Sequence, residues 1–278
     1  MDGPLSGLTR QYDELHRDHP PMVLEVGDVA WRYTAVGAGP SGLVLFPGAV
    51  GSGEAFFGLV PRLADRYRMI MPTIPIVPNL DGFVEGLDAI LNAETIGHVA
   101  MIGSSFGGML AQTSLFRCPD RMTAIVLSAT APPRPGRAEE NERWHWVYRA
   151  MPMPVTRALL RLVFRVMFRK VTVERDFWSR FYFSAIAEFT RADLECRYRL
   201  ALEFDHRYAA TPPDLTTWNG RMLIIQGDAD TLINDESREL MRSTYPRAEV
   251  CTIRGAGHGP LLERPEEWLD AVSRFLVS

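Results

Sequence analysis

Lysine, cysteine and long apolar runs are scarce or missing in this chain of 278 residues. Lys170 is the only lysine, and we attribute no function to that imbalance. Three cysteines, Cys118, Cys196 and Cys251, are odd in number and widely spread, which argues against a disulfide framework and fits a reducing compartment. No apolar run approaches the roughly 20 residues that cross a bilayer as a helix, so we expect no integral membrane segment.

Two further absences narrow the classes of function. The formal net charge is −4 and the isoelectric point about 5.9, so the chain lacks the basic excess typical of nucleic-acid-binding domains. Its first residues have no basic region followed by an apolar stretch, so we expect no secretory signal. These observations predict a cytoplasmic protein that binds no nucleic acid.

Strand-like and helix-like patterns alternate along most of the chain. Residues 23–33 alternate between apolar and polar types around Gly27-Asp28, which predicts a β-hairpin. Further strands are expected at 43–46, 68–71, 98–102, 123–127, 222–226 and 248–253. Helices are expected at 8–19, 53–65, 81–93, 108–116, 235–244 and from Pro265 onward. The alternation predicts the α/β class, with a mostly parallel central sheet covered by helices on both faces.

One segment interrupts this alternation. Prolines cluster at residues 131–136, and the alternation resumes near residues 212–215. Between these borders the sequence has helical periodicity and no clear strand. We therefore expect a helical insert with two stiff, proline-marked junctions.

The most specific motif is Gly-Ser-Ser-Phe-Gly at residues 103–107. It lies between an apolar run and a helical segment, which is the strand–turn–helix context of a nucleophile elbow. Glycine at both ends removes side chains that would collide in so tight a turn. The motif favours Ser105 as the nucleophile and the backbone N–H of Phe106 as a donor to an oxyanion. The plainer interpretation of Ser105 is a small residue that fits a tight glycine turn. That interpretation suits the neighbouring Ser104.

Two more motifs follow strand-like runs. They read Gly-Asp-Ala-Asp at residues 227–230 and Gly-Ala-Gly-His-Gly at residues 255–259. His258 is the candidate base, because an imidazole with an ordinary pKa of about 6.5 can accept and return a proton near neutral pH. Asp230 would hold the tautomer of that ring and stabilise its charged form. Taken alone, His258 also fits an ordinary loop histidine, but three motifs together favour a catalytic triad.

In these motifs, and in their order Ser, Asp, His, the chain resembles the α/β-hydrolase fold family from about Val23 to its C-terminus. The resemblance implies an α/β-hydrolase core at residues 1–131 and 214–278, with a helical cap at residues 132–213 inserted after the sixth strand. It also implies that the N–H of Ala49, in the loop after the third strand, is the second oxyanion donor. Serine at the elbow argues against epoxide hydrolases and haloalkane dehalogenases, whose members carry aspartate there.

Two other aspartates compete with Asp230 for the role of the acid. The family pattern Gly-x-x-Asp begins at Gly227 and selects Asp230. We expect Asp228 to be a turn residue that hydrogen-bonds its own backbone. We expect Asp235 to be the N-cap of the following helix.

Two loops depart from the family pattern. Pro47-Gly48 replaces the usual His-Gly, and residues 73–79 lack the usual glycines. Both changes alter the expected pocket wall and leave the three motifs intact. With Phe56-Phe57 they also give a loose likeness to maspardin, a protein of this fold that is better known as a binding partner.

The expected cap is rich in aromatic and large apolar side chains. As a group they favour a bulky apolar substrate, although packing within the cap is the plainer interpretation for each one. The set is Trp144, Trp146, Tyr148, Met151, Met153, Phe164, Phe168, Phe177, Trp178, Phe181, Tyr182 and Phe183.

Four arginines, Arg157, Arg161, Arg165 and Arg169, recur at every fourth position and predict a basic helix face. Such a face would suit an anionic lipid surface or an acidic carrier domain. A solvated face is the plainer interpretation.

Neither a metal nor a nucleotide cofactor is indicated. Residues 16–19 read His-Arg-Asp-His, but no second histidine or cysteine cluster supports a metal site. The glycine-rich residues 37–42 precede a strand and do not join a strand to a helix, so they lack the dinucleotide-binding context.

The sequence therefore predicts a serine hydrolase that cleaves a small apolar ester, thioester or lactone through an acyl-enzyme on Ser105, without cofactor or metal. Two alternatives stay open, because one fold hosts many functions. One is a non-hydrolytic enzyme of the same fold, such as a cyclase, a carbon–carbon lyase or an acyl transferase, which the altered loops motivate. The other is a binding protein with an unused site, against which the intact triad argues.

Overall fold

The computed structural model describes residues 7–211 and 213–277, except for the side chains of residues 144 and 148. Within these ranges the strands form an eight-stranded sheet in the order β1-β2-β4-β3-β5-β6-β7-β8. β2 is antiparallel to β1 and β4, and the other neighbours are parallel. The strands are β1 (Met22–Val26), β2 (Val29–Val36), β3 (Ser41–Phe46), β4 (Tyr67–Pro72), β5 (Val99–Ser104), β6 (Met122–Ser128), β7 (Arg221–Gly227) and β8 (Glu249–Ile253).

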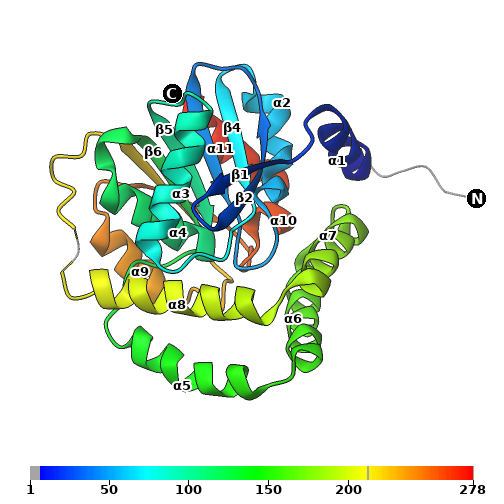
Figure 1. Cartoon of the computed structure of the whole chain (residues 1–278), viewed down its shortest axis with the longest axis vertical. Coiled ribbons are helices and arrows are strands. Elements are labelled where there is room, and N and C mark those ends of the chain that lie inside the picture. Colours follow the sequence, from blue (N-terminus) through cyan, green and yellow to red (C-terminus); the bar gives the residue numbers. More distant parts are fainter. Residues whose placement is uncertain (1–6, 212, 278) are drawn as a thin grey trace, which may run out of the picture.

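Helices cover both faces of the sheet, because alternate residues of each buried strand point to opposite sides. Val44 and Met101 pack into the apolar core beneath α3 and α4, whereas Leu45 and Ile102 pack into the core beneath η1 and α11. Figure 1 shows these layers. The helices outside the segment between β6 and β7 are α1 (Gly7–Asp18), η1 (Gly53–Leu59), α2 (Val60–Leu63), α3 (Leu80–Ala93), α4 (Phe106–Arg117), η2 (Pro119–Arg121), α9 (Asp235–Thr244), α10 (Pro260–Glu263) and α11 (Pro265–Val277).

The segment between β6 and β7 is helical. It contains α5 (Arg137–Ala150), α6 (Met153–Met167), η3 (Phe168–Lys170), α7 (Arg175–Glu188) and α8 (Arg191–Tyr208). In Figure 1, α8 runs beneath the core and α6 and α7 stand at one side. A capping box fixes the start of α8: Thr190 Oγ1 accepts from the N–H of Asp193, whose carboxylate accepts from the N–H of Thr190.

The predicted class and sheet are confirmed, and the hairpin turns at Gly27-Asp28 as expected. The predicted helix at 53–65 begins as a 3₁₀ helix, η1, and ends as the short α2. No helix in the described ranges is both long and apolar enough to cross a bilayer. The division into a core and a cap at residues 132–213 stays a proposal, which the helical segment between β6 and β7 supports.

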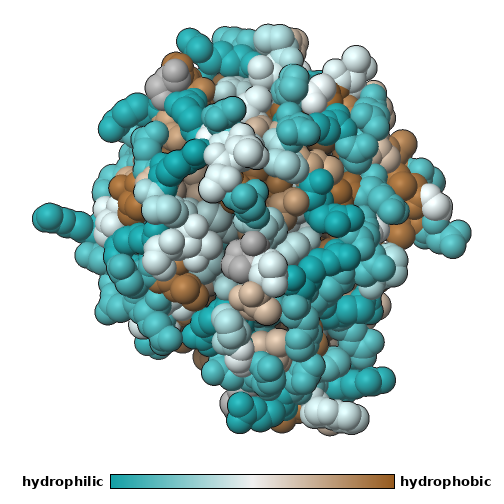
Figure 2. Space-filling view, turned by 90° about the vertical axis from the view of Figure 1, so that its left-hand side faces the viewer, coloured by the Kyte–Doolittle hydropathy of each residue, from teal (hydrophilic) through white to brown (hydrophobic). Residues whose placement is uncertain are grey.

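The surface near α9 is mostly hydrophilic. Figure 2 shows this face, where teal atoms dominate and brown patches lie apart from one another. Scattered apolar patches of this kind are normal on a folded domain.

Candidate active site

Ser105 lies in a strained turn between β5 and α4. Its φ of 52° and ψ of −117° are angles that residues with a side chain rarely adopt. A Cβ at Gly107 would lie 2.2 Å from the carbonyl oxygen of Pro47, and one at Gly103 would lie 2.3 Å from the carbonyl oxygen of Gly107. The glycines therefore permit the close packing that lifts Ser105 above the sheet.

Hydrogen bonds hold this turn on both sides. The N–H of Ser105 donates to the carbonyl of Ser128 (2.9 Å). The carbonyl of Ser105 accepts from Thr130 Oγ1 (2.8 Å). The end of β6 thus fixes the backbone of Ser105, as strain at a functional residue requires.

His258 faces Ser105 across the carboxyl edge of the sheet. Its Nε2 lies 2.9 Å from Ser105 Oγ, and its Nδ1 lies 2.9 Å from Asp230 Oδ2. The three residues follow β5, β7 and β8, whose C-terminal ends lie at one edge because these strands are parallel. The structure therefore brings together the three side chains that the sequence selected.

Asp230 is buried, with 4% of its surface exposed. Its Oδ1 accepts from the N–H groups of Leu232 (2.8 Å) and Ile233 (3.0 Å). Burial disfavours the charged carboxylate, but the hydrogen bond and charge of His258, with these N–H groups, outweigh burial and hold the pKa of Asp230 below its usual value. The carboxylate is therefore ionised and oriented at neutral pH.

Two expectations for the neighbouring aspartates were wrong. Asp228 Oδ1 accepts from the N–H of Gly255 (2.6 Å), in the loop after β8, and so joins two loops. The N-cap of α9 is Asn234, whose side chain accepts from the N–H of Ser237 (3.0 Å). Asn234 has the extended backbone that an N-cap needs, whereas Asp235 is already the first helical residue.

The loop after β3 passes beside the nucleophile. A Cβ at Gly48 would lie 3.9 Å from Ser105 Cβ. Phe106 is the first residue of α4, where backbone N–H groups have no carbonyl of the preceding turn to bind. These positions support the prediction that the N–H groups of Ala49 and Phe106 stabilise an oxyanion.

Arg197 of α8 contacts the same region, and the sequence analysis missed it. This guanidinium is 7% exposed and donates to the carbonyls of Ala49 (3.4 Å), Pro75 (3.2 Å) and Ile74 (2.7 Å). Its Cζ lies 5.9 Å from the centre of the Phe106 ring. Burial lowers the pKa of Arg197, because the charged group has left water. Arg197 therefore joins the helical segment to both loops that depart from the family pattern.

Comparison with known proteins places the chain in a family. A model described as "Alpha/beta hydrolase family" matches residues 43–271. The chain belongs to the alpha/beta hydrolase family. The predicted family and the predicted α/β-fold hydrolase are confirmed.

Curated relatives of this hydrolase are esterases and a lipase. A pimeloyl-[acyl-carrier protein] methyl ester esterase of Aeromonas hydrophila is 26% identical in an alignment of 268 positions that covers 86% of this chain and 96% of the relative. The sn-1-specific diacylglycerol lipase ABHD11 of Danio rerio is 23% identical, over 84% of this chain and 78% of the relative.

Solved structures confirm the fold. A hydrolase from Pseudomonas aeruginosa superposes with a TM-score of 0.75 at 22% identity, over 93% of this chain and 99% of that one. At that identity the likeness concerns the fold alone.

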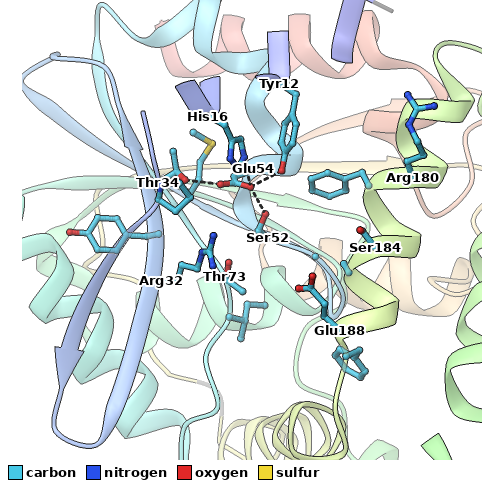
Figure 3. A pocket seen from close by; sticks show the side chains of 18 of the residues that line it. Tyr12, His16, Arg32, Thr34, Ser52, Glu54, Thr73, Arg180, Ser184 and Glu188 are labelled. Carbon is cyan, nitrogen blue, oxygen red and sulfur yellow. Dashed lines mark hydrogen bonds and ion pairs between the residues drawn. The ribbon is translucent and has the colours of Figure 1, made fainter. Parts of the chain in front are cut away.

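A cavity of about 600 Å³ lies beside the loop after β3 of this hydrolase. Ala49 and Gly51 line it, together with Phe177 and Phe181 of α7 and charged residues such as Arg180 (Figure 3). Two of the aromatic residues singled out in the sequence therefore line this cavity, and Phe177 also belongs, with Phe168 and Trp178, to a buried apolar core. Trp144 and Tyr148 have side chains outside the described part of the structure.

Glu54, at the start of η1, forms a buried polar cluster in the wall of this cavity (Figure 3). It accepts from the hydroxyls of Thr34 (2.7 Å), Tyr12 (2.9 Å) and Ser52 (3.2 Å). Nε2 of His16 lies 3.2 Å from Glu54 Oε2, but it makes no hydrogen bond within the described residues. Burial, and then the charge and hydrogen bond of Glu54, raise the pKa of Tyr12, which stays a neutral donor.

Proposed function

We propose that this α/β hydrolase cleaves a carboxylic ester through an acyl-enzyme on Ser105. The observation that carries the proposal is the pair of 2.9 Å contacts that His258 makes with Ser105 and Asp230. The names of the curated relatives support an ester as substrate. We keep a small apolar acyl group, with thioesters and lactones as close variants, because the helical segment between β6 and β7 is rich in aromatic side chains.

The first half of the reaction forms the acyl-enzyme. His258 Nε2 takes the proton of Ser105 while Oγ attacks the carbonyl carbon of the ester. Asp230 holds Nδ1–H and stabilises the imidazolium. When the tetrahedral intermediate collapses, the bond between the acyl carbon and the alcohol oxygen breaks, and His258 gives its proton to the departing alcohol.

The second half repeats the transfer with water. His258 takes a proton from water, whose oxygen attacks the acyl carbon. The bond to Ser105 Oγ then breaks, the serine recovers its proton, and the carboxylic acid leaves. In both halves the N–H groups of Ala49 and Phe106 stabilise the negative oxygen, a contribution of about 3–4 kcal/mol per donor in other hydrolases. Arg197 binds the carbonyl of Ala49 and so positions the N–H of the same residue.

The experiment compares Ser105→Ala with Ser104→Ala on p-nitrophenyl esters of increasing acyl length, a thioester and a lactone. Ser104 is the matched control, because it is the adjacent serine of the same turn and lies at the end of β5. We expect Ser105→Ala to lose at least about 10³-fold in kcat, while Ser104→Ala stays within about tenfold. Circular dichroism confirms that both variants are folded.

Two results would contradict the proposal. Hydrolysis that persists in folded Ser105→Ala excludes covalent catalysis by this serine. Labelling of Ser105 by a fluorophosphonate with no hydrolysis across the panel favours a non-hydrolytic reaction at the same residue.

A further inference from the structure

Helix α6 presents large apolar side chains to solvent. Val155, Leu159, Leu162, Val163 and Val166 recur at intervals of three and four residues, so they share one side of the helix. Each is between 42% and 54% exposed. We call these five residues the outer face of α6. Of the fourteen exposed large apolar residues in the described ranges, eight lie between residues 146 and 173, so this exposure is concentrated in one segment.

The opposite side of α6 already has its packing partner. Phe164 stacks on Tyr182 of α7 at a centroid distance of 4.9 Å, and Thr156 is buried. Leu160 packs beside Ile186, also on α7. The outer face is therefore not needed for contact with α7, and its side chains are exposed on a helix that stands at the edge of the molecule (Figure 1).

The charged residues in and around α6 are all basic. Residues 151–173 contain four arginines and Lys170 but no aspartate or glutamate, in a chain whose net charge is −4. Within the described part of the structure, none of these five cations forms an ion pair with a carboxylate. Arg161 and Arg165 lie on α6 itself, and the guanidinium of Arg165 stands 5.6 Å from the centre of the Phe183 ring on α7. Arg157 donates to the carbonyl of Phe189 (3.0 Å).

We propose that α6 binds an anionic lipid surface, lying in the plane of the interface with its outer face toward the acyl chains. Helices that bind in this way have an apolar face and arginines or lysines beside it, and they do not span the bilayer. Long arginine side chains can keep their guanidinium at the lipid phosphates while their stems lie along apolar surface.

Other occupants fit less well. In a symmetric dimer the outer face would meet itself, and the cations of the two copies would be brought together without carboxylates to offset them. An acidic protein would satisfy the cations, but five exposed aliphatic side chains along one helix also need an apolar partner. A lipid surface supplies anions and acyl chains together, without requiring shape complementarity.

The test measures binding of the full chain to sedimented vesicles. The probes are vesicles of phosphatidylcholine alone and vesicles with about 30% phosphatidylglycerol, at low and at high salt. We expect at least about tenfold stronger binding to the anionic vesicles, since each basic residue near such a surface contributes about fivefold. Binding should weaken as salt screens the surface charge.

Two pairs of substitutions separate the apolar from the charged contribution. Leu162→Glu with Val166→Glu should abolish binding, and Arg161→Gln with Arg165→Gln should weaken it about 20-fold. The matched controls are Val23→Glu on β1 and Arg242→Gln on α9, which alter exposed residues outside the segment and should leave binding unchanged. Hydrolysis of a soluble ester should be unaltered in the two double variants and in the two control variants. Unaltered hydrolysis shows that these four proteins are folded.

Several results would overturn the proposal while leaving the active site untouched. One is wild-type protein that fails to sediment with anionic vesicles at low salt. Another is equal vesicle binding by the wild type and by Leu162→Glu with Val166→Glu. A dimer that this pair of substitutions dissociates, or binding to an acidic carrier protein, in the absence of vesicle binding would assign the outer face to a protein partner.

Discussion

Among the carboxylate–histidine pairs of the described residues, two have a buried carboxylate, and in only one of these two does the histidine also meet a serine. Asp230 lies 2.9 Å from His258, and Glu54 lies 3.2 Å from His16. Both carboxylates are less than a tenth exposed. The pairs differ in what surrounds them: the second nitrogen of His258 meets a strained serine, whereas Glu54 is surrounded by three hydroxyl donors.

The comparison shows two differences: His258 is hydrogen-bonded to its carboxylate and meets a serine on its other side, whereas His16 Nε2 makes no hydrogen bond within the described residues. A histidine held by a carboxylate transfers a proton only where a nucleophile lies on its other side. The hydrogen bonds of Glu54 join α1, β2 and η1, so we interpret the cluster as a structural device. The predictions below change one pair at a time.

The largest effect is expected for Asp230→Asn. An amide at this position keeps the shape but favours the wrong tautomer of His258, and in other triads the loss in kcat is about 10⁴-fold. Steady-state kinetics on a p-nitrophenyl ester would measure it. The matched control is Glu54→Gln, which should keep kcat within about threefold. Equal losses of kcat in both variants would contradict the distinction between the two pairs.

Arg197→Met should reduce kcat by about tenfold to 100-fold and change KM by less than about threefold. Its loss frees the carbonyl of Ala49 and so misplaces an oxyanion donor, which acts only in the transition state. Arg199→Met is the control, because Arg199 lies on the same helix and donates to the carbonyl of Val77 (2.6 Å) but not to Ala49. A change confined to KM would assign Arg197 to substrate binding.

Substitutions at the Glu54 cluster should act on stability. Glu54→Gln should lower the free energy of unfolding by about 1–3 kcal/mol, because the hydroxyl donors lose a charged acceptor. Tyr12→Phe removes one of those hydrogen bonds and should cost about 1 kcal/mol. Urea unfolding followed by circular dichroism measures both changes. A stability equal to that of the wild type in both variants would show that the cluster contributes nothing.

The smallest effect concerns pH. Because the folded pKa of Asp230 lies below its unfolded value, its contribution to stability is present above about pH 4 and is lost as the pH falls through the folded pKa. The difference in unfolding free energy between the wild type and Asp230→Asn should therefore be smaller at pH 3 than at pH 5. A difference that grows on acidification would contradict the assigned direction.

The active site was predictable from sequence because its parts are local signals. Each triad residue lies within a few residues of glycines at or just after the end of a strand, and parallel strands bring such ends together. The Glu54 cluster has no such signal, since Tyr12 and Thr34 are distant in sequence and are ordinary residues of a helix and a strand. Arg197 could not be told from Arg199, because both are arginines of one helix and only packing distinguishes them.

One of the two errors arose because two adjacent residues have the same local preference. Asn234 and Asp235 are both good N-caps, and the backbone angles that decide between them follow from the approach of the loop to α9. Asp228 bonds to Gly255 of another loop, a contact that local sequence does not encode.

The central claim is that Ser105 alone becomes acylated. Reaction of the folded protein with a fluorophosphonate, followed by proteolysis and mass spectrometry, tests it directly. The account predicts one adduct, on the peptide that contains Ser105, together with complete loss of esterase activity. Full ester hydrolysis by a protein whose Ser105 peptide stays unmodified, or an adduct on another residue that abolishes activity, would contradict it.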